Sequence, residues 1–395
     1  MAAVTVVSVG SLTAQERTAQ ERPDTLVLVS SLAVPDSIPL TYVTQLVSGT
    51  DGSVFLLDAQ TDGVLVFDSD GAFRRRIGRK GQGPGELLTP WRLGLLGQDT
   101  LWVVDAGRPR VNLYNASTGA SLADSGPATW DLAAAAGQLL QPFAVLADHS
   151  VVAITWGVEG VLVNVLAFRV VGRQTDPEGV SLSVLDVQDR VLAVPVPAGG
   201  AGLQLRNPFS HGDMLAIGPT GKHVAFIRRP KPVGSRAFFT VERYDVLEGG
   251  TDAIRVPYSL RPLDTKDIRA WAADLGAIDR MVEMGVFPSH TSGVNAVLDA
   301  LDEPDYYPPV RNRGRGIVEE AVLIDFGATM WFQVSDVPGR VNDWIAVSDN
   351  HGVSRVSVPD GARLLAVQGD LVWAERRDGF GVPSVHMFRV QAAGR

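Results

Sequence analysis

Cationic and aromatic side chains that could hold a ligand occur at a few places in the 395-residue chain. Trp91 and Arg92 directly follow a glycine-rich loop, and two further arginines lie just beyond the next apolar segment. Indole and guanidinium groups bind ligands by stacking and by donating hydrogen bonds, so these residue types favour a binding site over a catalytic one. The predicted ligand-binding residues are Trp91, Arg92, Arg108, Arg110, His211 and Trp271.

Motifs for catalysis are missing from the sequence. The 6 histidines are scattered, no HExxH, EF-hand or paired-histidine spacing occurs, and no GxSxG elbow is present. There are no cysteines, which excludes disulfides and thiolate ligands. The loop Gly81–Glu86 matches neither phosphate-binding glycine motif, and its proline removes a backbone N–H. We therefore predict no metal site, no cofactor and a non-catalytic protein, with a divalent cation such as calcium left open.

Charge and hydropathy exclude two kinds of partner. A net charge of −9 argues against a nucleic-acid binder, which would carry a strongly basic face. No apolar run reaches the roughly 20 residues that a membrane span needs. Residues 2–12 are apolar and are followed by small residues, which resembles a signal peptide that lacks its basic start. Residues 1–20 are thus expected to be a signal peptide or a disordered tail, and the protein to be exported to the periplasm or beyond, or otherwise cytoplasmic.

These candidate residues must be positioned by a repeated β-hairpin. Residues 53–70 reappear as residues 100–117, 47 positions later, each with an apolar strand, an aspartate-led turn and a second strand. Asp58 aligns with Asp105, and an aspartate at a turn is expected to accept backbone N–H groups. Weaker copies begin near residues 149, 221, 329 and 370.

Six such units predict an all-β, six-bladed β-propeller. The last unit has only three strands before the chain ends, and the apolar segment 24–32 can supply the fourth. Closure through this N-terminal strand would leave no open edge on the ring. We expect residues 24–395 to be a single propeller domain and a monomer.

The loop and strand between Gly78 and Arg110 carry a family resemblance. The glycine-rich loop, Pro90, the strand Leu101–Asp105 and then Arg110 are similar to an NHL repeat, over residues 50–115. The rest of the chain, including Tyr306–Pro309, resembles bacterial exported six-bladed propellers. Some six-bladed relatives, of the gluconolactonase and amidating-lyase kind, bind a metal in the channel with ligands drawn from different blades. The resemblance therefore keeps an enzyme as an alternative.

One segment, residues 246–316, interrupts the repeat between the fourth and fifth units. Asp264 and Thr265 can cap a helix with apolar positions from Ile268 to Val282, and Ser292 can cap a second helix through Leu301. This insertion is expected either to cover the channel as a lid or to form one wall of a binding site.

Together these features predict an exported propeller that binds a protein, peptide or glycan through its loop-rich face. The alternative is a metal-dependent lactonase or lyase with its site in the channel. A third hypothesis is an envelope scaffold that docks a partner on the exposed helix face Ile268–Val282.

Overall fold

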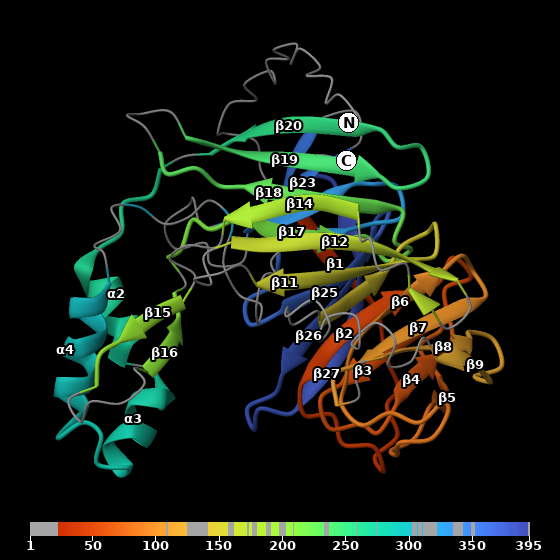
Figure 1. Cartoon of the computed structure of the whole chain (residues 1–395), viewed down its shortest axis with the longest axis horizontal. Coiled ribbons are helices and arrows are strands. Elements are labelled where there is room, and N and C mark those ends of the chain that lie inside the picture. The colour runs from red at the N-terminus through yellow and green to blue at the C-terminus, as the bar shows by residue number, and fades with distance from the viewer. Residues whose placement is uncertain are drawn as a thin grey trace.

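The computed structural model shows a ring of β-sheets with a small lobe beside it (Figure 1). It describes residues 23–107, 110–124, 141–156, 162–171, 174–175, 180–186, 191–196, 203–207, 209–232, 237–258, 260–273, 275–301, 306, 310, 322–334, 343–348 and 352–393. The segment 1–20, expected to be a signal peptide or tail, lies outside these residues.

The first two sheets are the repeated units of the sequence. Each is a four-stranded antiparallel meander, in which strand order follows chain order. The strands are β2 (Val43–Ser48), β3 (Val54–Asp58), β4 (Val64–Phe67), β5 (Phe73–Ile77), β6 (Pro90–Leu96), β7 (Thr100–Asp105), β8 (Arg110–Asn115) and β9 (Ser121–Asp124). Apolar, β-branched side chains on both faces of β3 and β4 are buried, because each sheet packs between two neighbours.

The next two sheets follow the same plan. In the third, β12 pairs with both β11 and β14, and the fourth is a plain meander. The strands are β10 (Gln141–Val145), β11 (Ser150–Trp156), β12 (Leu162–Val171), β13 (Gln174–Thr175), β14 (Val180–Asp186), β17 (Met214–Ile217), β18 (His223–Arg228), β19 (Phe238–Asp245) and β20 (Thr251–Pro257). Strand β20 falls within the segment 246–316 expected to be an insertion, so the insertion begins only after Pro257.

The last two sheets share one hydrogen-bonded ladder. The strands are β21 (Val322–Ile324), β22 (Met330–Gln333), β23 (Asp343–Val347), β24 (Val353–Ser357), β25 (Arg363–Gln368), β26 (Leu371–Arg377), β27 (Pro383–Gln391) and β1 (Asp24–Ser31). Strand β1 pairs antiparallel with β27 as the outer strand of the final sheet, and for two residues in parallel with β24. The N-terminal strand therefore closes the ring, as predicted, and the fold is an all-β propeller.

We call the first strand of each meander, such as β2, β6 and β10, its inner strand. The inner strands all begin on the same face of the ring. Within a meander, the end of the second strand lies beside the start of the inner strand, as Asp105 lies beside Pro90. We call this side the mouth face. Both chain segments that leave the ring depart from it, after Asp186 and after Pro257.

These two segments build a separate lobe. It contains β15 (Val191–Val194), β16 (Leu203–Arg206), α2 (Thr265–Ala273), α3 (Gly276–Glu283) and α4 (His290–Ala300). Its own core joins hairpin residues such as Val194 to helix residues such as Ile278 and Val297. The single helix expected over Ile268–Val282 is two helices, broken ahead of Gly276.

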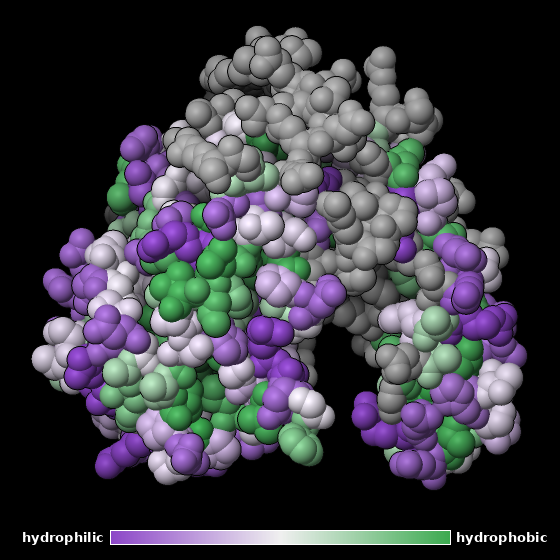
Figure 2. Space-filling view, turned by 180° about the vertical axis from the view of Figure 1, so that it is seen from behind, coloured by the Kyte–Doolittle hydropathy of each residue, from purple (hydrophilic) through white to green (hydrophobic). Residues whose placement is uncertain are grey.

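The apolar face of these helices packs on the β15–β16 hairpin, so it neither lies exposed for a partner nor packs on the ring. The cap of α4 is Ser289, while Ser292 is its reciprocal partner in a capping box. Figure 2 shows a deep cleft between the lobe and the ring. None of the helices among the described residues has the length and apolar character needed to span a bilayer.

Candidate functional site

The start of several inner strands is bent by a one-residue bulge. The pairing register shifts between Val43 and Gln45, between Pro90 and Arg92, between Pro142 and Ala144, and between Leu364 and Ala366. A bulge turns the side chains next to it out of the regular alternation of a strand. The bulges therefore redirect Trp91 and Phe143 at the mouth of the ring.

Arg92 lies between two of these bulged residues. Its guanidinium carbon is 4.1 Å from the ring centre of Phe143 and 5.8 Å from that of Trp91. Within the described part of the chain no carboxylate pairs with this guanidinium, and its buried Nε donates no hydrogen bond. Burial removes the hydration of the charged form and lowers the pKa of Arg92 to about 10. The side chain is still a cation at pH 7, held on an aromatic face with unused donors.

Inner strands are linked to their neighbours around the mouth by polar side chains. Arg363 at the start of β25 donates to the carbonyl of Val43, and Gln45 on β2 accepts from the N–H of Leu93 at 3.0 Å. Arg92 on β6 continues this series to β10, but it meets an aromatic ring there instead of an acceptor. That difference leaves its N–H groups available to a ligand.

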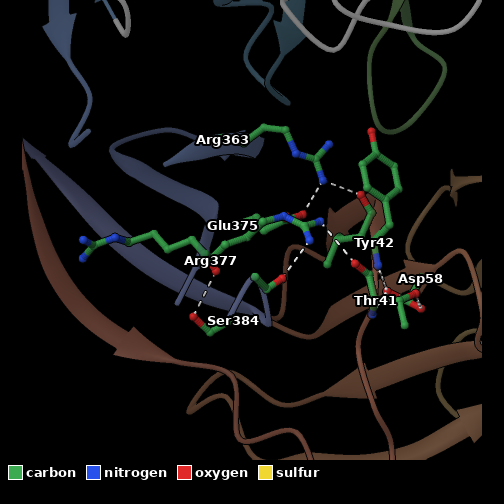
Figure 3. Close-up of polar contacts among 10 residues, drawn as sticks. Thr41, Tyr42, Asp58, Arg363, Glu375, Arg377 and Ser384 are labelled. Atoms are coloured by element: carbon green, nitrogen blue, oxygen red, sulfur yellow. Dashed lines mark hydrogen bonds and ion pairs between the residues drawn. The ribbon is translucent and has the colours of Figure 1, made fainter. Parts of the chain in front are cut away.

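Where the last sheet meets the first, two arginines share one carboxylate (Figure 3). Arg363 and Arg377 both pair with Glu375, whose side chain is buried. Their guanidinium carbons lie 4.9 and 5.9 Å from the ring centre of Tyr42. Asp58 lies behind them and accepts the N–H groups of Thr41 and Tyr42 at 2.9 and 2.7 Å, which fixes the chain that carries the Tyr42 ring.

The turn between β26 and β27 presents an exposed phenylalanine beside this cluster. Phe380 is 96% exposed and Val382 53%. The Asp378 carboxylate accepts the N–H groups of both residues at 2.9 Å, and Arg377 donates to Gly381 O at 2.9 Å and to Thr41 O at 3.2 Å. The backbone at Phe380 is thus held in an ordered turn that is tied to the Tyr42 segment, and the Phe380 ring projects into solvent. We call Tyr42, Phe380 and Val382 the apolar patch.

A second group of polar residues lies where the lobe leaves the ring. Arg229 is buried and donates to Gly212 O at 3.0 Å and to Val310 O at 2.7 Å, so it ties together the chain entering β17 and the chain returning from the helices. Burial, together with Arg229 and Lys231, lowers the pKa of His211 to about 4. Burial raises the pKa of Tyr258 to about 12, an effect that Arg229 partly offsets. His211 is therefore neutral at pH 7.

The predicted binding residues are not all brought together. Trp91 and Arg92 are adjacent at the mouth, whereas His211 lies at the base of the lobe. Trp271 is inside the lobe, edge-on to Phe209 at 5.4 Å. Arg110 is buried and donates to the carbonyls of Gly83 and Glu86, which holds the glycine-rich loop. Arg108 is outside the described residues.

The repeated aspartates bind backbone, as the turn pattern indicated. Asp105 accepts from the N–H groups of Leu88, Thr89 and Gly107 at 2.9, 2.8 and 3.1 Å. Asp58 does the same in the first sheet. In the ranges that the structure describes, no three histidine, aspartate or glutamate side chains lie close enough together to hold a metal ion.

Sequence reasoning missed Phe143, Tyr42, Arg377 and Phe380. Phe143 falls in a weak copy of the repeat, and only packing places it under Arg92. The turn Asp378–Gly381 carried a readable signal, because an aspartate, a phenylalanine and two glycines between strands predict an ordered turn with an outward aromatic side chain.

Comparison with known proteins agrees with the architecture. The family model of a 6-bladed beta-propeller matches residues 5–121. None of the curated proteins matches the chain.

Solved structures of low identity match over nearly the whole chain. A luciferin-regenerating enzyme has 10% identity and a TM-score of 0.42, covering 93% of this chain and 96% of that one. Virginiamycin B lyase from Staphylococcus aureus has 9% identity and a TM-score of 0.40, covering 92% of this chain and 98% of that one. Regucalcin, a calcium-binding protein from Agrobacterium tumefaciens, has 10% identity and a TM-score of 0.40, covering 93% of this chain and 96% of that one. Similarities of this size say nothing about activity.

Proposed function

We propose that this protein is a binding module that takes up a peptide segment of a partner protein on its mouth face. The observation that carries the proposal is the apolar patch, in which a nearly fully exposed phenylalanine is held by an ordered turn beside a tyrosine and two arginines. Aromatic residues and arginine are the residue types that dominate binding energy at interfaces. A rigid turn also lowers the conformational entropy lost on binding.

Export is part of this proposal. Support comes from the apolar segment 2–12 and from the resemblance of the glycine-rich loop to an NHL repeat. On this view the mature protein acts as a monomer in the periplasm or outside the cell, with the lobe forming one wall of the cleft in Figure 2.

Selection from a random peptide library displayed on phage tests the binding function. We expect the selected peptides to bind the wild-type protein with micromolar dissociation constants and Phe380→Ala at least tenfold more weakly, since about 1.4 kcal/mol corresponds to a factor of ten. Leu247→Ala is the control, because Leu247 is also an exposed apolar turn residue (60%) but lies in the β19–β20 turn on the opposite face. Equal binding to wild type and Phe380→Ala would exclude the apolar patch as the site.

A further inference from the structure

We infer that Arg92 and Trp91 form a carboxylate-binding site at the mouth of the ring, next to the apolar patch. The inference rests on the proposed peptide-binding function and names the group of the peptide that this part of the face recognises. An acidic side chain or a C-terminal carboxylate would supply the anion.

The first argument is the state of the Arg92 guanidinium. Arginine has five N–H donors and no acceptor, and a planar fork that matches the two oxygens of a carboxylate. Arg92 is half-buried, and a guanidinium withdrawn from water normally has a carboxylate partner, because a buried unpaired charge is costly. Arg92 instead rests on Phe143, and its Nε is buried without an acceptor.

The second argument is a neighbouring donor in the same state. Trp91 Nε1 is also buried without a hydrogen-bond partner, and the Trp91 ring lies edge-on to Phe143 at 5.9 Å. Two adjacent residues that both contact the Phe143 ring therefore each keep a buried donor without a partner. A group of donors with no acceptor among them is suited to an anion and not to a cation or a neutral donor.

The third argument is position. Gln45 on β2 bonds the backbone of Leu93 on β6, so the strand that follows Tyr42 and the strand that carries Arg92 are neighbours at the mouth. A peptide lying across these two strands would place apolar side chains on the patch and an acidic group on Arg92. A peptide is favoured over a glycan, because the exposed ring of Phe380 and the side chain of Val382 suit apolar side chains.

Benzoate is a direct probe of this site, with benzamide as its neutral isostere. In the isotope-labelled full-length protein, the arginine Nε–Hε and tryptophan indole resonances report binding, and Trp91→Phe identifies one of the 8 indoles. We expect saturable shifts of both resonances with sodium benzoate at constant ionic strength and none with benzamide. Equal shifts with the two compounds would overturn the inference.

Variants then separate this inference from the proposed function. Arg92→Gln should weaken benzoate binding at least tenfold, and Arg92→Lys, which keeps the charge but loses the fork, severalfold. Arg74→Gln, on the exposed outer strand β5, is the matched control and should change nothing. Selected peptides that require Phe380 but bind Arg92→Gln normally would leave the proposed function standing and refute the carboxylate site. Peptides that require neither residue would refute the proposed function, and the benzoate titration would still decide the site.

Discussion

Single side chains in this ring act mainly by satisfying backbone groups from neighbouring segments. Asp58 and Asp105 accept N–H groups from the loop ahead of their own sheet, Arg110 donates to the carbonyls of the glycine-rich loop, and Arg229 ties the base of the lobe. Arg92 departs from this pattern, because it contacts aromatic rings in place of a carbonyl or carboxylate. At this scale, a charged group without a polar partner is the feature that points to a ligand.

His211 should make stability depend on pH. Its pKa of about 4 in the folded protein lies below its ordinary value of 6.5, so in that interval the unfolded chain binds a proton that the folded protein excludes. Folding stability attributable to His211 is therefore complete above pH 6.5 and is lost as the pH falls toward 4. The loss is at most about 3.5 kcal/mol, since the pKa is lowered by about 2.5 units and one unit corresponds to about 1.4 kcal/mol.

Urea unfolding of the wild type and His211→Gln at pH 7 and pH 4.5 measures this loss. The free energy of unfolding of the wild type, relative to that of His211→Gln, should be smaller at pH 4.5 than at pH 7. His386, whose pKa is also lowered by burial, titrates in the same direction in both proteins and cancels in the comparison. A difference that stays constant with pH would contradict the assignment.

At the scale of secondary-structure elements, the lobe is built from two segments that are far apart in the chain. The hairpin β15–β16 precedes the fourth sheet and the helices α2–α4 follow it, yet they share one apolar core. Neither segment could bury its apolar side without the other, because a two-stranded hairpin or a short helix is marginal alone. The lobe should consequently behave as one cooperative unit.

Val297→Asp should unfold the lobe and leave the ring folded. Val297 is fully buried in the lobe core, and a carboxylate there would have no partner. We expect hydrogen exchange to become fast in both β15–β16 and α2–α4, while β3 and β26 stay protected. Asn295→Asp, at an exposed position of the same helix, is the control. Fast exchange in α2–α4 with continued protection of β15–β16 would disprove the shared unit.

At the scale of the whole molecule, the ring is held closed by its two ends. Strand β1 pairs with β27 from Thr25 to Ser31. Just after β1, Ala33 forms a parallel bridge with Ala72, which directly precedes β5, the outer strand of the first sheet. Asp24 also accepts the N–H of Ala393 at 2.9 Å. Closure thus joins the last sheet, the first sheet and both termini of the described chain.

Truncation separates the closing strand from the residues before it. Removing residues 2–31 should lower Tm by 10 °C or more and expose an edge of β27, because a row of ladder hydrogen bonds and the packing of Leu26 are lost. Removing residues 2–20 should change Tm by no more than about 2 °C. Thermal unfolding followed by circular dichroism measures both, and equal effects would show that β1 does not close the ring.

The repeat in the sequence was enough to predict the propeller and the closing strand. Each sheet is a run of consecutive hairpins, so its pattern of apolar residues and turn aspartates is local and survives in the sequence as a period of about 47 residues. The missing fourth strand of the last sheet could be inferred for the same reason, since an unpaired edge is costly. The backbone role of Asp58 and Asp105 also follows from turn chemistry alone.

The candidate site depended on the tertiary structure. Trp91 and Arg92 stood out by residue type, but their contact with Phe143 arises from two bulges on different sheets, and no local pattern encodes a contact between them. The sequence predicted the helical insertion but not its partner, because the apolar face of the helices shows only that a partner exists, not that it is the β15–β16 hairpin from before the fourth sheet. Local periodicity determines which elements form, whereas long-range packing decides which of their side chains meet.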